Sequence, residues 1–234
     1  PDRDILLMSP LAEGADRLAA EEALELGLPL TVILPMPRQQ YLDDFATEES
    51  RAQFARLCSR ATDVFELPLT PGNNLALNQG QGPNRSRQYA QAGVFLSAHC
   101  HILLALWDGN ESDSLGGTAQ VVRFHQDDVM PGYTPSAATS RISLTDDESD
   151  LVYHIVCSRG RPGGGLASGL RPLDCWWFTR DEHAPRTTEL PERYRVIFAR
   201  TNEFNLDMRK HAQAIAAGGY PLLDQGREQE LPAG

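Results

Sequence analysis

The sequence predicts an α/β fold built on a mostly parallel sheet with helices on both faces. Two observations predict this class. Apolar runs of strand length occupy residues 5–8, 30–34 and 102–106, and segments of helical length lie between them. Glycine-containing turns at residues 9–14 and 114–118 each follow an apolar run and precede a helical pattern. Strands and helices that alternate in this way form βαβ units, whose strands pair in parallel.

The first predicted unit begins with a turn that is shaped to hold an anion. Ile5–Met8 is a continuous apolar run, as expected for a strand covered on both faces. Ser9, Pro10 and Gly14 interrupt it, and glycine lets a backbone approach a ligand because it has no Cβ. The amides and dipole of the following helix favour a phosphate near this turn. The same residues are equally typical of a tight βα connection without a ligand.

An amphipathic helix and a second strand complete this unit. The helix is expected from Ala15, because apolar residues recur at helical spacing: Leu18, Ala19, Ala23, Leu24 and Leu26. Gly27 ends the helix as a C′ residue. Leu30–Leu34 forms the next strand, and the prolines that follow stop it.

The middle of the chain continues the alternation. Residues 41–61 are predicted to be mostly helical, and residues 64–67 form a short strand. Residues 70–86 are rich in Pro, Gly, Asn and Gln and carry Arg85, with Arg87 just beyond, so we expect a long exposed loop there. A helix over 88–98 and a strongly apolar strand over 102–106 follow. That strand leads to Trp107, Asp108 and Gly109.

A second glycine turn follows this strand. Gly116, Gly117 and Thr118 precede a helical pattern, so backbone amides and the Thr118 hydroxyl can meet a phosphate at the helix N-terminus. The ends of parallel strands lie along one edge of a sheet, and two such turns there form a crevice for a ligand. The turn is neither a P-loop nor a GxGxxG dinucleotide fingerprint.

The remaining chain divides the protein into three predicted segments: 1–157, 158–190 and 191–234. In the first, residues 126–150 form a polar loop and residues 151–157 a last strand. The second contains the glycine-rich run 158–170, which imitates a phosphate loop but is more typical of a flexible linker. It also contains Trp176–Phe178, either a stacking platform for a base or an aromatic cluster that packs a sheet edge. The third is a helical arm or connector with a disordered tail.

Charge and composition exclude several classes of protein. The net charge of −11 and the single lysine, Lys210, disfavour nucleic-acid binding, which depends on phosphate neutralisation. The four cysteines form no CxxC pair, so a cytoplasmic, reducing location is expected, and His99 and His101 around Cys100 are read as structural rather than as a metal site. No apolar run is long enough to span a membrane. Because the chain starts at Pro1 and enters a strand almost at once, we expect a first βα unit to lie upstream.

Two segments resemble known families. The run SPLAEGADRLAAEEALELGLPLTVILP resembles the SGLARGID segment, with its helix and strand, of the DNA-processing protein A family. The run GGTAQVV resembles the PGGxGTxxE motif of the lonely-guy cytokinin-activating and lysine-decarboxylase-like proteins. Together these motifs define the SLOG superfamily of Rossmann-like nucleotide-binding domains, and the similarity covers about residues 4–125.

The resemblance implies roles for particular residues. Ser9, Gly14 and Asp16 would shape the first turn, and Gly116, Gly117 and Thr118 would hold a phosphate. Lonely-guy enzymes use a glutamate after the GT to help cleave an N-glycosidic bond, and the corresponding position here is Gln120. An amide cannot serve as that carboxylate. The GxTGHR-type strand that often lies upstream in this superfamily is absent from the sequence.

The same resemblance extends to bacterial signalling or conflict proteins in which a SLOG domain precedes a membrane-spanning effector segment. The LAEGADRLA, WDG and GGTA runs carry this similarity, and the RYRVIFARTNEFN run is similar to the connector found there. It implies a homodimer and an effector outside this chain. This is an argument from fold-level analogy.

Three functions compete on this basis. The first is a nucleotide-sensing module without a resident cofactor, whose predicted ligand-binding residues are Ser9, Pro10, Leu11, Glu13, Gly14, Asp16, Arg85, Arg87, Asp108, Gly116, Gly117, Thr118 and Gln120. The second is a phosphoribohydrolase acting on nucleoside monophosphates, with Arg85 or Arg87 positioning phosphate and Glu13 or Asp108 replacing the missing acid. The third is a protein that handles single-stranded DNA, which the acidic charge disfavours.

Overall fold

The computed structural model describes residues 5–134, 150–158, 160, 164–181 and 186–217. They divide into two compact units, one ending at Glu189 and the other starting at Leu190. The first unit extends past residue 157 and includes the described parts of 158–189. We describe the two units separately.

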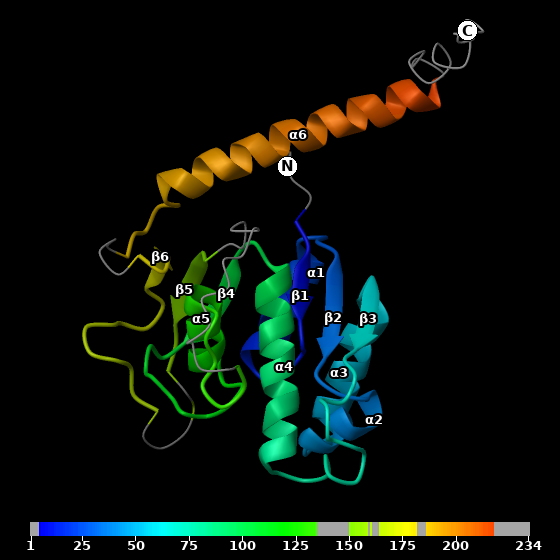
Figure 1. Ribbon diagram of the computed structural model, residues 1–234, viewed down its shortest axis with the longest axis vertical. Helices are drawn as coiled ribbons and strands as arrows, with labels where there is room; N and C mark the ends of the chain where they lie inside the picture. The colour runs from blue at the N-terminus through cyan, green and yellow to red at the C-terminus, as the bar shows by residue number, and fades with distance from the viewer. Residues whose placement is uncertain (1–4, 135–149, 159, 161–163, 182–185, 218–234) are drawn as a thin grey trace, which may run out of the picture. The chain divides into compact units, whose positions relative to one another are not determined.

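The first sheet of the larger unit is parallel and has the strand order β1-β2-β3 (Figure 1). Its strands are β1 (Leu7–Ser9), β2 (Leu30–Leu34) and β3 (Asp63–Glu66). The connecting helices are α1 (Ala15–Glu25), α2 (Arg38–Tyr41), the 3-10 helix η1 (Leu42–Asp44) and α3 (Glu48–Arg60). Gly27, with a φ of 73°, follows α1 in the left-handed conformation predicted for it.

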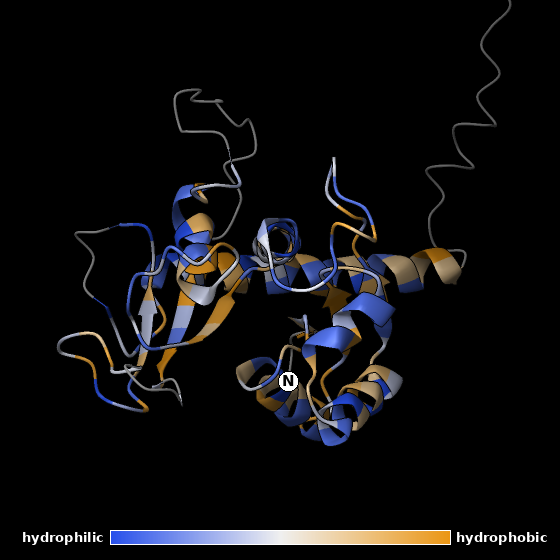
Figure 2. Cartoon of the chain, turned by 90° about the horizontal axis from the view of Figure 1, so that it is seen from below, coloured by the Kyte–Doolittle hydropathy of each residue, from blue (hydrophilic) through white to orange (hydrophobic). Residues whose placement is uncertain are grey.

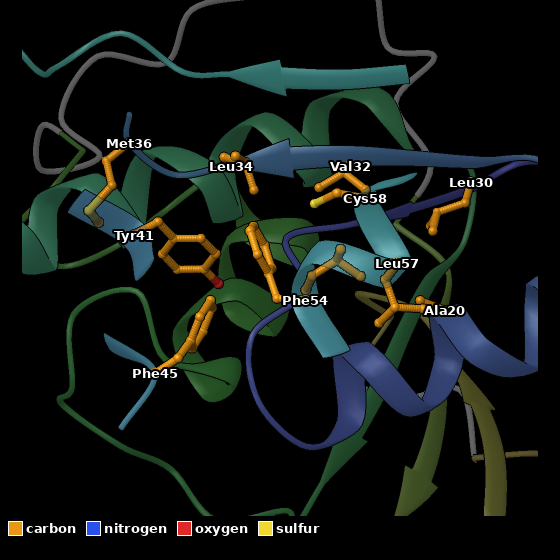
Figure 3. Packing of buried hydrophobic residues seen from close by; sticks show 11 residues of the cluster. Ala20, Leu30, Val32, Leu34, Met36, Tyr41, Phe45, Phe54, Leu57 and Cys58 are labelled. Carbon is orange, nitrogen blue, oxygen red and sulfur yellow. The ribbon is translucent and has the colours of Figure 1, made fainter. Parts of the chain in front are cut away.

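The central strand of this sheet is buried on both faces, as the sequence predicts. Leu30, Val32 and Leu34 join a cluster with residues of α1 and α3 (Figure 3). Ile33 packs instead with Ala92 of α4 (Pro83–His99). Because neighbouring strand residues point to opposite faces, this alternation shows that helices cover both sides of the first sheet. The predicted α/β class is therefore confirmed.

The second sheet comprises β4 (Leu103–Trp107), β5 (Val152–Val156) and β6 (Cys175–Phe178). Strands β4 and β5 are parallel, whereas β6 is antiparallel to β5. Helix α5 (Thr118–Asp127) packs Ala119 and Val122 against this sheet. The aromatic cluster 176–178 thus belongs to a strand at the edge of the sheet, one of the two predicted alternatives.

The strands form two sheets rather than the single sheet expected. Strand β1 pairs only with β2, and β4 pairs only with β5, among the described residues. Ile5 and Leu6, predicted to begin the first strand, lie outside it and are exposed. Helix α4 lies between the two sheets in both views (Figures 1 and 2). It packs against α5 where Gly93 leaves room for Val121.

The predicted loop 70–86 is more ordered than the sequence indicates, and the predicted helix 41–61 is less regular. In the stretch 70–86, Asn78 is buried and donates a hydrogen bond to Gln40 Oε1 at 2.9 Å. The end of that stretch is helical, because α4 begins at Pro83, a residue suited to a first helical position. The predicted helix over 41–61 is interrupted by extended residues around Phe45 before α3 begins.

The glycine-rich run 158–170 is anchored rather than a free linker in its described part. The Ala167 amide donates to the Asp108 carbonyl at 2.9 Å, and Asn110 Nδ2 donates to the Gly165 carbonyl at 2.7 Å. Leu170 lies against Gly109. These contacts hold residues 164–170 to the end of β4. Residues 135–149, most of the predicted polar loop 126–150, lie outside the described residues.

The smaller unit is built around one long helix. Helix α6 (Glu192–Ala216) has 25 residues and lies within the segment 191–234, for which the sequence predicts a helical arm or connector. Residues 218–234, where the predicted disordered tail falls, lie outside the described residues. Over the described residues, no helix combines the length and apolar character that crossing a bilayer requires.

Candidate functional site

The two predicted turns lie at the carboxyl ends of β1 and β4. We call Ser9–Gly14 the first turn and Ser114–Thr118 the second turn. Tyr89 of α4 lies near both. Its side chain packs on the buried cluster that contains Leu11, and a Cβ added to Gly116 would lie 2.7 Å from the Tyr89 Cβ. The close packing of Gly116 on α4 explains why this turn needs a glycine.

Side chains bind two amides of the first turn. Ser9 Oγ accepts a hydrogen bond from the Leu11 amide at 3.1 Å and donates one to the Asp16 carbonyl at 3.3 Å. The Asp16 carboxylate accepts the Ala12 amide at 3.2 Å. The amides of Leu11 and Ala12 are therefore already occupied by groups of the protein, and a phosphate there would have to displace a carboxylate.

The backbone of the first turn is held in an unusual conformation. Leu11 has a φ of 57°, in the left-handed region, although it is a bulky residue with a fully buried side chain. Such a conformation costs about 1–2 kcal/mol for an L-residue. The Leu11 carbonyl accepts a hydrogen bond from Arg17 Nε at 3.1 Å. This hydrogen bond helps to offset the cost of the left-handed conformation. Pro10 precedes this residue and is half-buried.

Arg17 holds the first turn in place through its hydrogen bonds. It is only 2% exposed, and its guanidinium lies 4.3 Å above the centre of the Phe45 ring. Its Nη1 donates to Ser50 Oγ at 2.8 Å and to Gln53 Oε1 at 3.0 Å. The Ser50 hydroxyl in turn donates to the carboxylate of Glu13, which lies at the exposed rim of the turn. The charge of Arg17 thus stabilises the fold.

Asp16, the second residue of α1, has a carboxyl group whose pKa is perturbed. Burial raises its pKa from the ordinary 3.8 to about 6, and the hydrogen bond from Ala12 and the charge of Arg17 offset only part of this effect. Asp16 is therefore an acceptor whose charge responds to mildly acidic pH. Gly14, with a φ of 94° and open space around it, begins α1 without a side-chain cap.

The second turn leaves open the amides with which α5 begins. The Gly117 amide donates to the Ser114 carbonyl at 2.9 Å, and α5 then begins with no side-chain cap. Among the described residues, no acceptor pairs with the amides of Thr118 and Ala119. Thr118 is exposed. Unpaired amides at a helix start, together with the helix dipole, favour an anion at this position.

Gln120 lies on the first turn of α5, directly after these amides. It is 5% exposed, and its Oε1 has no donor within the part of the chain that the structure describes. A buried acceptor without a donor costs about 1–3 kcal/mol. A hydroxyl or amino group of a ligand would satisfy it. The predicted site residues Gly116, Gly117, Thr118 and Gln120 thus lie together around one helix start.

Asp108 occupies the end of β4, at the same edge as the turns. It is buried, and its Oδ1 accepts the Asn110 amide at 3.0 Å. This hydrogen bond shapes the turn after the strand. Gly109 continues the turn with a φ of 79°.

The two arginines predicted to bind a ligand differ in their surroundings. Arg85 is buried, where Nε donates to Asp44 at 3.0 Å, and its other nitrogens donate to the Asn78 and Gln40 carbonyls. Its donors hold α4 to the segment around η1, so we omit it from the proposed ligand contacts. Arg87 is exposed on α4.

Sequence reasoning missed the aromatic and acidic residues behind the first turn. The Tyr89 hydroxyl donates to the Asp44 carboxylate, and burial raises the pKa of Tyr89 above its ordinary value. Tyr41 is also buried, and its hydroxyl points toward Phe45 and Phe54 (Figure 3). In the sequence, these tyrosines were indistinguishable from other core aromatics. The one available signal was the spacing of Arg85 and Tyr89, which places both on one face of a helix.

The fold and the turns define a Rossmann-like α/β protein with an open helix start at one sheet edge. No model of a known protein family matches the chain, and no curated protein shows significant sequence similarity to it. Among the described residues, no group of three or more His, Cys, Asp or Glu side chains is arranged to hold a metal ion.

Proposed function

We propose that the larger unit binds a small phosphorylated ligand of the nucleotide class, with a phosphate at the amides of Thr118 and Ala119. The observation that carries this proposal is the uncapped start of α5, where both amides lack acceptors among the described residues. Phosphate oxygens are well suited to such amides, since each can accept charge-assisted hydrogen bonds.

The position of this helix start in the fold supports the proposal. The chain runs through β1, β2 and β3 in one sheet and then crosses by α4 to β4 in the other. In open α/β proteins, ligands bind outside the carboxyl ends of the strands, where the direction of strand order changes. The second turn follows β4 and therefore lies at such a point.

The remaining polar groups suit the uncharged part of a nucleotide. Gln120 Oε1 offers a buried acceptor beside the phosphate position. The carboxylates of Asp16 and Glu13 offer acceptors for hydroxyl groups at the first turn and would repel a phosphate there. We therefore assign the phosphate to the second turn alone. Hydroxyl or amino groups of the sugar or base would donate to Gln120 Oε1 and to the carboxylates of Asp16 and Glu13.

A sensing role follows from the chemistry of Gln120. In the resemblance to lonely-guy enzymes, Gln120 stands where those enzymes carry a catalytic glutamate, and a neutral amide neither takes a proton nor stabilises an oxocarbenium ion. Helix α5 also packs closely on α4 through Gly93, so a ligand at the start of α5 is linked to the packing between the two sheets. On this proposal, the bound state is passed to a partner or to a downstream effector segment.

The proposal is tested by thermal unfolding of the chain with AMP, ADP and ADP-ribose, and with adenosine as the control without phosphate. A ligand that binds only the folded state stabilises it by RT ln(1 + [L]/Kd). We expect at least one phosphorylated compound to raise the melting temperature while adenosine does not. Equal shifts with adenosine, or none with any compound, would contradict a phosphate site.

A phosphoribohydrolase is the second candidate. The observation in its favour is that two carboxyl groups lie near the strand ends: Asp108 is buried after β4, and burial brings the pKa of Asp16 to about 6. A carboxyl pKa near the working pH is suited to proton transfer. Release of free adenine from AMP, lost in Asp108→Asn, Asp16→Asn or Glu13→Gln, would establish this activity. Binding of AMP without turnover would leave the sensing role.

A further inference from the structure

Helix α6 carries a stripe of exposed apolar side chains. Phe204 and Ile215 are each 63% exposed, and Ile197 and Met208 are also exposed. Helices gain most of their stability by packing an apolar face, and isolated helices are marginal in water. In Figure 2, the hydrophobic colour recurs along α6. A helix of 25 residues with this stripe therefore needs a partner surface.

The stripe has the spacing of a two-helix coiled coil. Ile197, Thr201, Phe204 and Met208 are separated by alternating steps of four and three residues, the spacing of a and d positions. Thr201 fits this pattern, because its hydroxyl donates to the Ile197 carbonyl at 3.0 Å. Its methyl group is then free to face a partner helix.

We propose that α6 pairs in antiparallel orientation with α6 of a second copy of this chain. The layers are then Ile197 with Met208 of the other copy and Thr201 with Phe204 of the other copy, each occurring twice by symmetry. A twofold interface of this kind uses the same surface on both partners. The apolar stripe is covered along the central turns of the helix.

Charge complementarity selects the second copy as the partner. Arg200 and Asp207 are both exposed and both occupy g positions beside the stripe. In the antiparallel arrangement, Arg200 of one helix faces Asp207 of the other, and the pair occurs twice. Asp207 already pairs with Lys210 at 3.3 Å, but an exposed pair of this kind contributes little and exchanges readily.

The same two residues fix the register and orientation. A shift by one heptad in either direction places Arg200 against Arg200, or Asp207 against Asp207, of the other copy, which is repulsive. In a parallel pair, Arg200 would face Asn205 and Asp207 would face Ala212, so neither charge would find an opposite charge. The shift that places Arg200 against Arg200 also brings Arg193 against Asp207, but it sets Phe204 against Tyr194, which is already buried in its own chain. The proposed register joins layers of exposed residues with two opposite-charge pairs and places no like charges together.

The test is the mass of the full chain in solution, measured by light scattering after size exclusion over a range of concentrations. We expect a dimer. Phe204→Glu should give a monomer, whereas Leu206→Glu should remain dimeric, because Leu206 is also exposed but lies on the other side of the helix. Circular dichroism of each variant verifies that the protein remains folded.

Charge reversal tests the orientation. Arg200→Glu and Asp207→Arg should each weaken the dimer about tenfold by placing like charges together. The double variant should restore it, because the pairs reform with exchanged signs. A monomeric wild type, a dimer unaffected by Phe204→Glu, or a double variant as weak as the single ones would overturn the proposal. A monomer that binds anionic vesicles through α6 would assign the stripe to a membrane surface instead.

Discussion

The first and second turns each follow a strand and precede a helix, yet a carboxylate accepts an amide of the first turn, whereas no carboxylate among the described residues accepts one of the second. In the first turn, Ser9 and the Asp16 carboxylate accept the amides of Leu11 and Ala12. In the second, the amides at the start of α5 have no acceptor among the described residues. A turn whose own side chains bind its amides is a structural element, whereas a turn that leaves them open can bind an anion.

Among the described residues, α3 is the one α-helix whose start has a side-chain cap. Thr47 precedes α3, and its hydroxyl accepts the Ser50 amide at 3.1 Å. A Ser, Thr, Asp or Asn cap is worth about 0.5–2 kcal/mol relative to alanine. Gly117 at the start of α5 forgoes this stabilisation, as do the residues before α1, α4 and α6, so the missing cap does not by itself distinguish α5.

The largest predicted effect concerns the support of the first turn. Arg17→Met should destabilise the protein by about 3 kcal/mol, because it removes the donors to Leu11, Ser50 and Gln53 and leaves buried acceptors unpaired. Urea denaturation measures this loss. Arg56→Met is the control, since the Arg56 pair with Glu21 is exposed and should cost less than about 0.5 kcal/mol. Equal effects would show that the first turn does not depend on Arg17.

Replacing a glycine by alanine should destabilise the protein more in the second turn than in the first. Gly116→Ala places a Cβ 2.7 Å from the Ala90 amide nitrogen, in addition to a φ of 78°, and should cost about 2–3 kcal/mol. Gly14→Ala meets open space and should cost only about 1 kcal/mol from its backbone conformation. Thermal unfolding of both variants tests this order. A larger loss of stability in Gly14→Ala than in Gly116→Ala would contradict the close packing that we describe at Gly116.

An aspartate introduced at the start of α5 or of α1 tests ligand binding separately from the stability of the fold. Thr118→Asp should weaken phosphate-ligand binding about tenfold or more through repulsion, while stabilising α5 slightly through its dipole. Ala15→Asp, the matched change at the start of α1, should leave binding nearly unchanged. Calorimetry with whichever nucleotide binds provides the comparison. Weaker binding only in Ala15→Asp would move the phosphate to the first turn.

Asp16 makes the first turn sensitive to pH. Because its pKa is raised from 3.8 to about 6 in the folded state, the folded protein holds this proton more tightly than the unfolded chain. Its contribution to stability is therefore full below about pH 4 and is lost as the pH rises to about 6. Asp16→Asn keeps an acceptor for Ala12. It should exceed the wild type in stability at pH 7 by on the order of 1 kcal/mol, with the difference disappearing near pH 4.

The periodicity of apolar residues predicted helices and strands better than it predicted how the strands pair and how the loops pack. Leu30–Leu34 is a strand with the predicted bounds, because four apolar residues and a β-branched threonine followed by prolines leave little alternative. The two-sheet arrangement was not predictable, since strand pairing depends on contacts between distant residues such as Leu103 and Val152. Likewise, polar glycine-rich composition indicated a linker at 158–170, whereas main-chain hydrogen bonds anchor its described part to β4.

The candidate site was predictable in position but not in detail. Glycines after apolar strands located both turns, because glycine is needed where φ is positive, as in Gly14 and Gly116. The sequence did not distinguish an occupied amide from an open one. That difference depends on where the side chains of Ser9 and Asp16 point. The same applies to Arg85, whose exposed-loop context suggested a ligand although its donors are used internally.

Backbone amide NMR during titration with AMP or ADP-ribose tests the difference between the turns most directly. Our account predicts that the amide signals of Thr118 and Ala119 shift most, and that those of Leu11 and Ala12 shift little because they stay bound to Ser9 and Asp16. Shifts concentrated at Leu11 and Ala12, or no shift at Thr118 and Ala119 despite measurable binding, would contradict the assignment of the phosphate to the second turn.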